Sequence, residues 1–296
     1  MAGSTRSPAT SRRLLGGELR SIRESAGKRI EDAAIRLECS TAKVSRLETG
    51  KGKPKVRDVR DLLEYYGIGD EVRNARLLTL AAEAQEQDWL SEFRDVIHGN
   101  MFADHLLQYV SLERDSSGLK QYEVDLIPGL LQTPEYIDAV CMAVFPERTE
   151  RERNRFIDFR VARQELLRRE PERPEVSFIL SEVAILRPVG SPGIMRRQLE
   201  SLLTQLDGDL SYIDFRLTPL SVEAPDGLGG PFLIIKFPDT DQDVVYLEGR
   251  EGATYLETNA DVARYERKFS TLERASLSRS ESLKRLAQEI EKLPAA

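Results

Sequence analysis

The stretch from Leu14 to Pro54 is the feature that most limits what this chain can fold into. Apolar residues recur there at spacings of three and four, which predicts helices, but Gly27 and Gly50 end two of the runs early. Helices this short are not stable in isolation. They must pack against one another, so the sequence predicts a small helical bundle.

Five helices are expected within residues 14–87. The first begins at Leu14, the second carries the small residue Ala34, and the third begins after Ser40, which is a good N-cap. Two further helices are expected over 54–69 and from residue 70 onward. Ala34 is small where the second and third helices must cross, which is typical of a helix-turn-helix.

The chain has a formal net charge of −7, but its first part is basic. Up to Arg57 there are 14 Lys or Arg residues against 6 Asp or Glu residues. Some of these cations lie in residues 1–13, where Ser, Thr and Arg predict a disordered, solvated arm. The other cations lie within the helical pattern, which favours binding to phosphate groups.

The third expected helix buries Val44 and Leu47 and leaves its opposite face uncovered. Such a face can enter a major groove and offer hydrogen-bond donors and a methyl group to base edges. The predicted base-reading residues are Thr41, Ala42, Lys43 and Arg46. The predicted phosphate-binding residues are Ser40, Ser45, Lys51, Lys53, Lys55 and Arg57. A bundle whose basic face is merely solvated is the alternative.

The pattern changes from about residue 88. Runs of β-branched and aromatic residues bounded by Pro or Gly predict strands, and helical patterns lie between them. The expected strands are 121–131, 175–181, 210–220, 230–237 and 243–249, and the expected helices are 150–170, 192–206, 259–277 and 278–293. Residues 88–296 are therefore expected to form a mixed α+β domain, which makes the whole chain α+β.

We expect no enzymatic activity, no cofactor and no metal in this second domain. Its two histidines, His98 and His105, have no nearby Cys and are too few for a metal site. Glu182 and Glu248 end strand-like runs and could converge as an acid/base pair. Carboxylates at strand ends are more often solvated or paired with Arg, and that interpretation is favoured.

Binding is the more credible task for the second domain. The turn that begins at Pro128 carries two leucines and opens into a helix with Tyr136, so it could form the lip of a pocket for a ligand or partner protein. Core packing is the alternative, because apolar pairs beside turns usually face inward. The candidate surface consists of Pro128, Gly129, Leu130, Leu131, Gln132 and Tyr136.

The segment "LRSIRESAGKRIEDAAIRLECSTAKVSRLETGKGKP" resembles the Xre-type, lambda-repressor-like helix-turn-helix regulators. The segments "IPGLLQTPEYIDAV", "FRVARQELLRREP", "SEVAILRPVG", "GPFLIIKFPD" and "VVYLEG" resemble the C-terminal domain of a large actinobacterial group of such regulators, the WhiJ-like proteins. This resemblance implies a five-helix DNA-binding domain that acts as a dimer, and a small partner protein encoded nearby. It also implies an ion pair between Arg23 and Glu48.

Three positions depart from that family's pattern. Ile30 stands where many relatives carry a phosphate-binding Gln, so we expect Ile30 in the core. Arg29 stands where Ser or Thr would cap the second helix, which weakens the cap by roughly 1 kcal/mol. Glu38 stands where Gly often makes the turn, and a left-handed conformation there would cost about 1–2 kcal/mol.

We therefore expect a cytoplasmic, sequence-specific transcription regulator that binds double-stranded operator DNA as a homodimer. Its second domain would provide dimerisation and sensing. One alternative is an antitoxin-like protein whose main task is holding a small partner protein, with DNA binding for autoregulation. Another is an enzyme with a DNA-tethering domain. No apolar run approaches the ~18 residues of a membrane-spanning helix.

Overall fold

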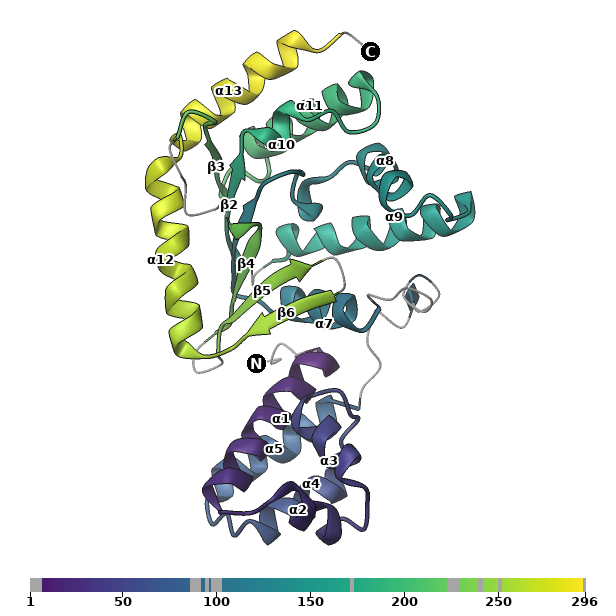
Figure 1. The fold of residues 1–296 in the computed structure, drawn as a ribbon, viewed down its shortest axis with the longest axis vertical. Helices are drawn as coiled ribbons and strands as arrows, with labels where there is room; N and C mark the ends of the chain where they lie inside the picture. The colour runs from purple at the N-terminus through teal and green to yellow at the C-terminus, as the bar shows by residue number, and fades with distance from the viewer. Residues whose placement is uncertain are drawn as a thin grey trace. The chain divides into compact units, whose positions relative to one another are not determined.

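The computed structural model describes residues 7–85, 92–93, 96, 103–170, 173–222, 229–238, 242–249 and 252–294. The chain forms two compact units (Figure 1). The first holds Met1–Arg94 together with Leu106–Asp115, and the second holds Asp95–His105 together with Ser116–Ala296. The boundary expected at residue 87 thus differs from the observed division. The backbone N–H of Ser7 donates to Asp115 Oδ2 at 2.8 Å, which ties the later segment to the first helix.

The first unit is a helical bundle, as the apolar spacing predicts. Leu19, Val44 and Val59 are fully buried in its core, and Ile30 packs against that core from a partly buried position. Spacing is a reliable guide here because each helix buries a single stripe of residues. The helices are α1 Pro8–Ser25, α2 Ile30–Arg36, α3 Thr41–Glu48, α4 Val56–Tyr65, α5 Glu71–Glu83 and, from Leu106 onward, α7 Ala103–Arg114.

The first helix begins earlier than predicted. Ser7 is its N-cap and accepts a hydrogen bond from the N–H of Thr10 at 3.3 Å, and Pro8 occupies the first turn. Ser11 is buried and donates from Oγ to Glu83 Oε2 at 2.8 Å. The prediction of a disordered arm is therefore wrong for residues 7–13, because their polar side chains cap and anchor α1.

The second unit is built on a six-stranded sheet with the order β3-β2-β1-β4-β5-β6. Strands β1, β2 and β3 run parallel, and β4, β5 and β6 are antiparallel to their neighbours. The strand predicted over 175–181 is β2, whereas β6 was not predicted. The strands are β1 Gly118–Glu123, β2 Glu175–Ser181, β3 Asp214–Thr218, β4 Phe232–Lys236, β5 Val244–Gly249 and β6 Gly252–Leu256.

Helices cover both faces of the sheet (Figure 1). Phe269 and Leu272 of α12 pack on Tyr122 and Ile179, whereas α8, α9 and α11 lie over the opposite face. None of the described helices has the length and hydrophobicity that a membrane crossing requires. The helices are the 3₁₀ turn η2 Gly129–Leu131, α8 Pro134–Val144, α9 Glu150–Gln164, η3 Glu165–Arg168, α10 Val183–Leu186, α11 Pro192–Asp207, α12 Asn259–Ala275 and α13 Arg279–Lys292.

Candidate DNA interface

Helix α3 presents a polar face to solvent, as predicted. Ser40 caps the helix by accepting a hydrogen bond from the N–H of Lys43 at 3.3 Å. Val44 and Leu47 are buried and hold α3 against the bundle. The residues that remain exposed on the other side are Thr41, Ala42, Ser45 and Arg46.

The turn into α3 is strained. Glu38 has φ 49°, and it is the only non-glycine residue with positive φ in the described part of the chain. The following N–H, of Cys39, donates to the carbonyl of Ala34 at 2.9 Å and closes the turn. The left-handed conformation considered for Glu38 is therefore present, and its expected cost is about 1–2 kcal/mol.

The loop after α3 is folded back onto the end of that helix. Gly50 has φ 70°, and a Cβ there would lie 2.9 Å from the Cα of Arg13, so only glycine fits. The N–H of Gly52 donates to the carbonyl of Arg46 at 2.8 Å. These contacts fix Lys51 and Lys53, both exposed, beside the last turn of α3.

A buried ion pair ties α3 to α1. Arg23 donates from Nε to Glu48 Oε1 at 2.7 Å and from Nη2 to Glu48 Oε2 at 2.9 Å, so the pair is bidentate. The two side chains are only 10% and 5% exposed. The hydrogen bond to Glu48 raises the pKa of Arg23 above its ordinary value. The ion pair that the family resemblance implies is present.

The cations around α3 differ in how far they are neutralised. Lys43 Nζ lies 2.7 Å from Asp58 Oδ2 of α4, and Arg57 Nε lies 3.8 Å from Asp61 Oδ2. Lys43 therefore braces α3 against α4, unlike the other predicted base readers. Four exposed cations make no ion pair with any described residue: Arg46, Lys51, Lys53 and Lys55. Their contacts with DNA stay predictions.

Of the six residues of the candidate binding surface, all but the half-buried Gly129 are buried. Leu130, Leu131 and Tyr136 are at most 2% exposed. Gln198 of α11 holds the segment from within: its Nε2 donates to the carbonyl of Leu131 at 2.8 Å, and its Oε1 accepts from the N–H of Thr133 at 2.7 Å. The alternative of core packing is the one observed, so the proposed ligand or partner surface is corrected.

Glu182 and Glu248 do not converge. Glu182 accepts from Arg285 Nε at 2.6 Å and from the N–H of Leu220 at 3.0 Å. It follows β2, whereas Glu248 lies on β5, and strands β1 and β4 separate the two in the sheet. The idea of an acid/base pair from these two carboxylates is therefore wrong.

The second unit contains a partly buried carboxylate, that of Glu123, and a polar cleft, neither of which the sequence pattern indicated. Burial, and then the negative charge of Glu248, raise the pKa of Glu123 to about 8. The cleft has a volume of about 1090 Å³ and is lined in part by Lys120 of β1 and Lys236 of β4. Both lysines pair with Glu266 of α12. No local motif signals these groups, because they come from different elements.

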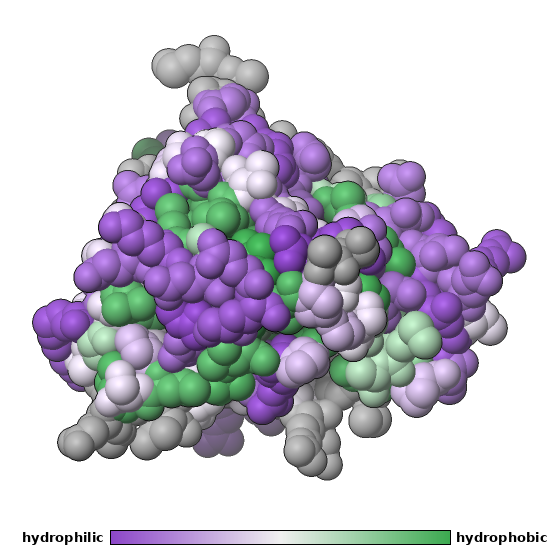
Figure 2. All heavy atoms as spheres, turned by 90° about the horizontal axis from the view of Figure 1, so that it is seen from above, coloured by the Kyte–Doolittle hydropathy of each residue, from purple (hydrophilic) through white to green (hydrophobic). Residues whose placement is uncertain are grey.

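No group of side chains suited to a metal ion occurs in the described part of the chain. His98 lies outside the described residues, and so does the side chain of His105. Viewed from above, hydrophilic side chains cover much of the surface, and apolar side chains form smaller groups between them (Figure 2). The predicted residues that the structure brings together on one exposed surface are those of α3 and the loop after it.

Two family models match the chain. A helix-turn-helix domain matches residues 14–75, and a domain of unknown function, DUF5753, matches residues 106–288. No curated protein and no solved structure matches it. The helix-turn-helix match covers the bundle that carries α3 and indicates a DNA-binding regulator. Since the second match spans more than half of its length, this chain belongs to the DUF5753 family, with a helix-turn-helix domain preceding the family's defining domain.

Proposed function

We propose that this protein is a sequence-specific transcription regulator of the Xre type that reads operator DNA with the exposed face of α3. One observation carries the proposal: Arg46 is exposed on that face and makes no ion pair with any described residue. Beside it lie three lysines that are also exposed and make no ion pair with any described residue. Unpaired cations repel one another, and a polyanion removes that cost. The face thus combines neutralisation of phosphates with donors for base edges.

The residues of this face divide by chemistry. The guanidinium of Arg46 can donate two parallel hydrogen bonds to a guanine, while Thr41 and Ala42 offer a hydroxyl and methyl groups. Ser40 and Ser45 suit phosphate contacts, as do the loop lysines. Lys43 would have to leave Asp58 to reach a base, so we assign it to the backbone of the duplex or to the bundle itself.

The test begins with duplexes selected by the protein from a random pool. Arg46→Ala should weaken binding to the selected operator by roughly 1–3 kcal/mol and relax the preference at one base pair. Lys53→Ala should instead weaken binding to all duplexes equally and reduce the slope of log K against log salt by about 0.9.

Arg20→Ala is the matched control for both variants. Arg20 is exposed on α1 and pairs with Glu24 in the same helix, so it contributes no unpaired cation to the α3 face. Its loss should leave operator affinity and the salt slope unchanged. If Arg46→Ala binds the selected operator as the wild type does, the reading face is misplaced.

We propose that the second unit provides dimerisation and responds to a ligand or a small partner protein. The polar cleft between the sheet and α12 supports the ligand role, since a ligand that took Glu266 from its lysines would change how α12 packs. A ligand regulates only if it binds two states with different affinity. We propose no catalytic role, and the regulator would act in the cytoplasm, where its operator lies.

A further inference from the structure

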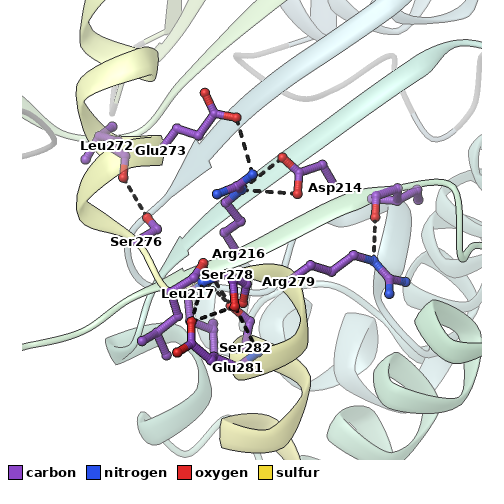
Figure 3. A network of polar contacts seen from close by, with 12 residues as sticks. Asp214, Arg216, Leu217, Leu272, Glu273, Ser276, Ser278, Arg279, Glu281 and Ser282 are labelled. Carbon is purple, nitrogen blue, oxygen red and sulfur yellow. Dashed lines mark hydrogen bonds and ion pairs between the residues drawn. The ribbon is translucent and has the colours of Figure 1, made fainter.

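The two edge strands of the sheet, β3 and β6, differ in how their outer sides are covered. An edge strand presents unpaired N–H and C=O groups that can pair with another strand. At the β3 edge both backbone groups of Leu217 are occupied. Its N–H donates to Ser282 Oγ at 2.9 Å (Figure 3). Its carbonyl accepts from the N–H of Leu277, also at 2.9 Å. Both partners come from the α12–α13 segment. The edge of β3 is thus closed by the chain itself.

Charged side chains also lie along β3. Arg216 Nε lies 3.0 Å from Asp214 Oδ2 on the same strand, and its Nη2 lies 3.6 Å from Glu273 Oε1 of α12 (Figure 3). Charges on an edge strand and helices laid over it are two ways in which proteins prevent unwanted pairing. The β3 edge has both.

Among the described residues, neither device is found at the β6 edge. Its sequence, Gly252-Ala-Thr-Tyr-Leu256, contains no charged residue and no proline. The strand pairs with β5 without a bulge, from Val245 opposite Leu256 to Gly249 opposite Gly252. No described strand lies beyond it in the sheet, and Thr254 at its centre is exposed. A regular, uncharged edge strand of this kind is a template for another strand.

We propose that β6 pairs antiparallel with β6 of a second copy of this chain, so that two six-stranded sheets join across a two-fold axis. This interface rests on the proposed function, because it supplies the dimer that a two-half-site operator requires. With the axis at Thr254, Thr254 faces its own copy, Ala253 faces Tyr255, and Gly252 faces Leu256. Small residues then lie opposite large ones.

Two features favour a second copy as the occupant. Strand β6 carries no charged residue, so pairing with β6 of a second copy places no like charges opposite each other within the strand. The β3 edge is closed, so β6 of one copy cannot add to β3 of the next and build an open-ended fibre. Pairing of β6 with β6 uses the same patch on both chains and closes at two.

The experiment measures the mass of the full chain by analytical ultracentrifugation over a range of concentrations, without DNA. Thr254→Lys and Thr254→Glu each place like charges opposite one another at the axis. Each should weaken dimerisation by about fivefold or more. An equimolar mixture of the two variants should recover the dimer, because opposite charges then meet. Misfolding of either variant would not produce that recovery.

Thr204→Lys is the matched control, since Thr204 is an exposed threonine on α11 and the charge change is the same. It should dimerise like the wild type. A wild type that stays monomeric at tens of micromolar, or two Thr254 variants that dimerise normally, would overturn the proposal. Binding of a Thr254 variant to a single half-site tests the α3 face separately from the dimer. If a Thr254 variant is monomeric but still binds a half-site, both the β6 interface and the α3 face are supported. If only Arg46→Ala loses half-site binding, that result concerns the α3 face and not the β6 interface.

Discussion

Alanine in place of either of two neighbouring glycines of α1, Gly16 and Gly17, should change the free energy of unfolding in opposite directions. A Cβ on Gly16 would lie 2.6 Å from the carbonyl oxygen of Leu47 and 2.8 Å from that of Glu48, at the end of α3. These are backbone atoms of a packed helix and cannot rotate away. A Cβ on Gly17 would meet no atom within 4 Å. The structure therefore has α1 crossing α3 at Gly16 and facing open space at Gly17.

The magnitudes follow from these distances. Alanine gains about 1 kcal/mol over glycine within a helix at either position. At Gly16 this gain opposes an overpacking cost of up to about 3 kcal/mol, since α1 must move off the end of α3. Gly16→Ala should thus lower the free energy of unfolding of the first unit by about 1–2 kcal/mol, and Gly17→Ala should raise it by about 1 kcal/mol.

Hydrogen exchange of buried amides in the full chain measures both effects, because it reports the opening free energy of each unit separately. Protected amides of α1 and α3 should exchange about tenfold faster in Gly16→Ala and several-fold slower in Gly17→Ala. Operator affinity should fall only in Gly16→Ala. If both variants shift exchange in the same direction, the close crossing of α1 and α3 is refuted.

Substitution of four glutamates should change stability in different ways. Glu48→Gln leaves Arg23 buried beside a neutral partner and should cost the first unit about 3 kcal/mol by hydrogen exchange; Glu24→Gln, an exposed partner of the same arginine, should leave exchange unchanged. Glu38→Gly relieves the left-handed strain and should stabilise the first unit by about 0.5–1 kcal/mol after the added chain entropy of glycine, and a loss of stability would contradict the strained turn. The pKa of Glu123 rises from 4.5 to about 8 on folding, so between these values the folded chain binds a proton that the unfolded chain lacks. The second unit should lose stability as pH rises through this window, by up to about 1.4 kcal/mol per pH unit, and Glu123→Gln should flatten that slope in urea unfolding.

Local signals made much of the first unit predictable. The cap at Ser40 and the apolar pair Val44 and Leu47 act within one helix, so the sequence alone indicated α3 and its exposed face. The start of α1 was missed although its signal is also local: Ser7 followed by Pro8 is a strong N-terminal pattern. The Ser, Thr and Arg content of the preceding residues outweighed it.

Other features that the sequence does not reveal depend on tertiary structure. The sequence does not show that α4 brings Asp58 within 2.7 Å of Lys43, whose role as a base reader stays a prediction. Strand β6 is short and rich in small residues, and its pairing with β5 defines it. The pKa of Glu123 depends on burial and on a charge from another strand. No pattern within one element carries that information.

The regulatory role depends on contact between DNA and α3 with the loop after it. Hydrogen exchange of the full chain with and without its selected operator tests this most directly, since it maps contacts along the whole sequence. On adding the operator, exchange should slow mainly in residues 40–57, and Arg46→Ala should show no such change at the same concentrations. Protection that falls elsewhere while residues 40–57 exchange as in the free protein would contradict it.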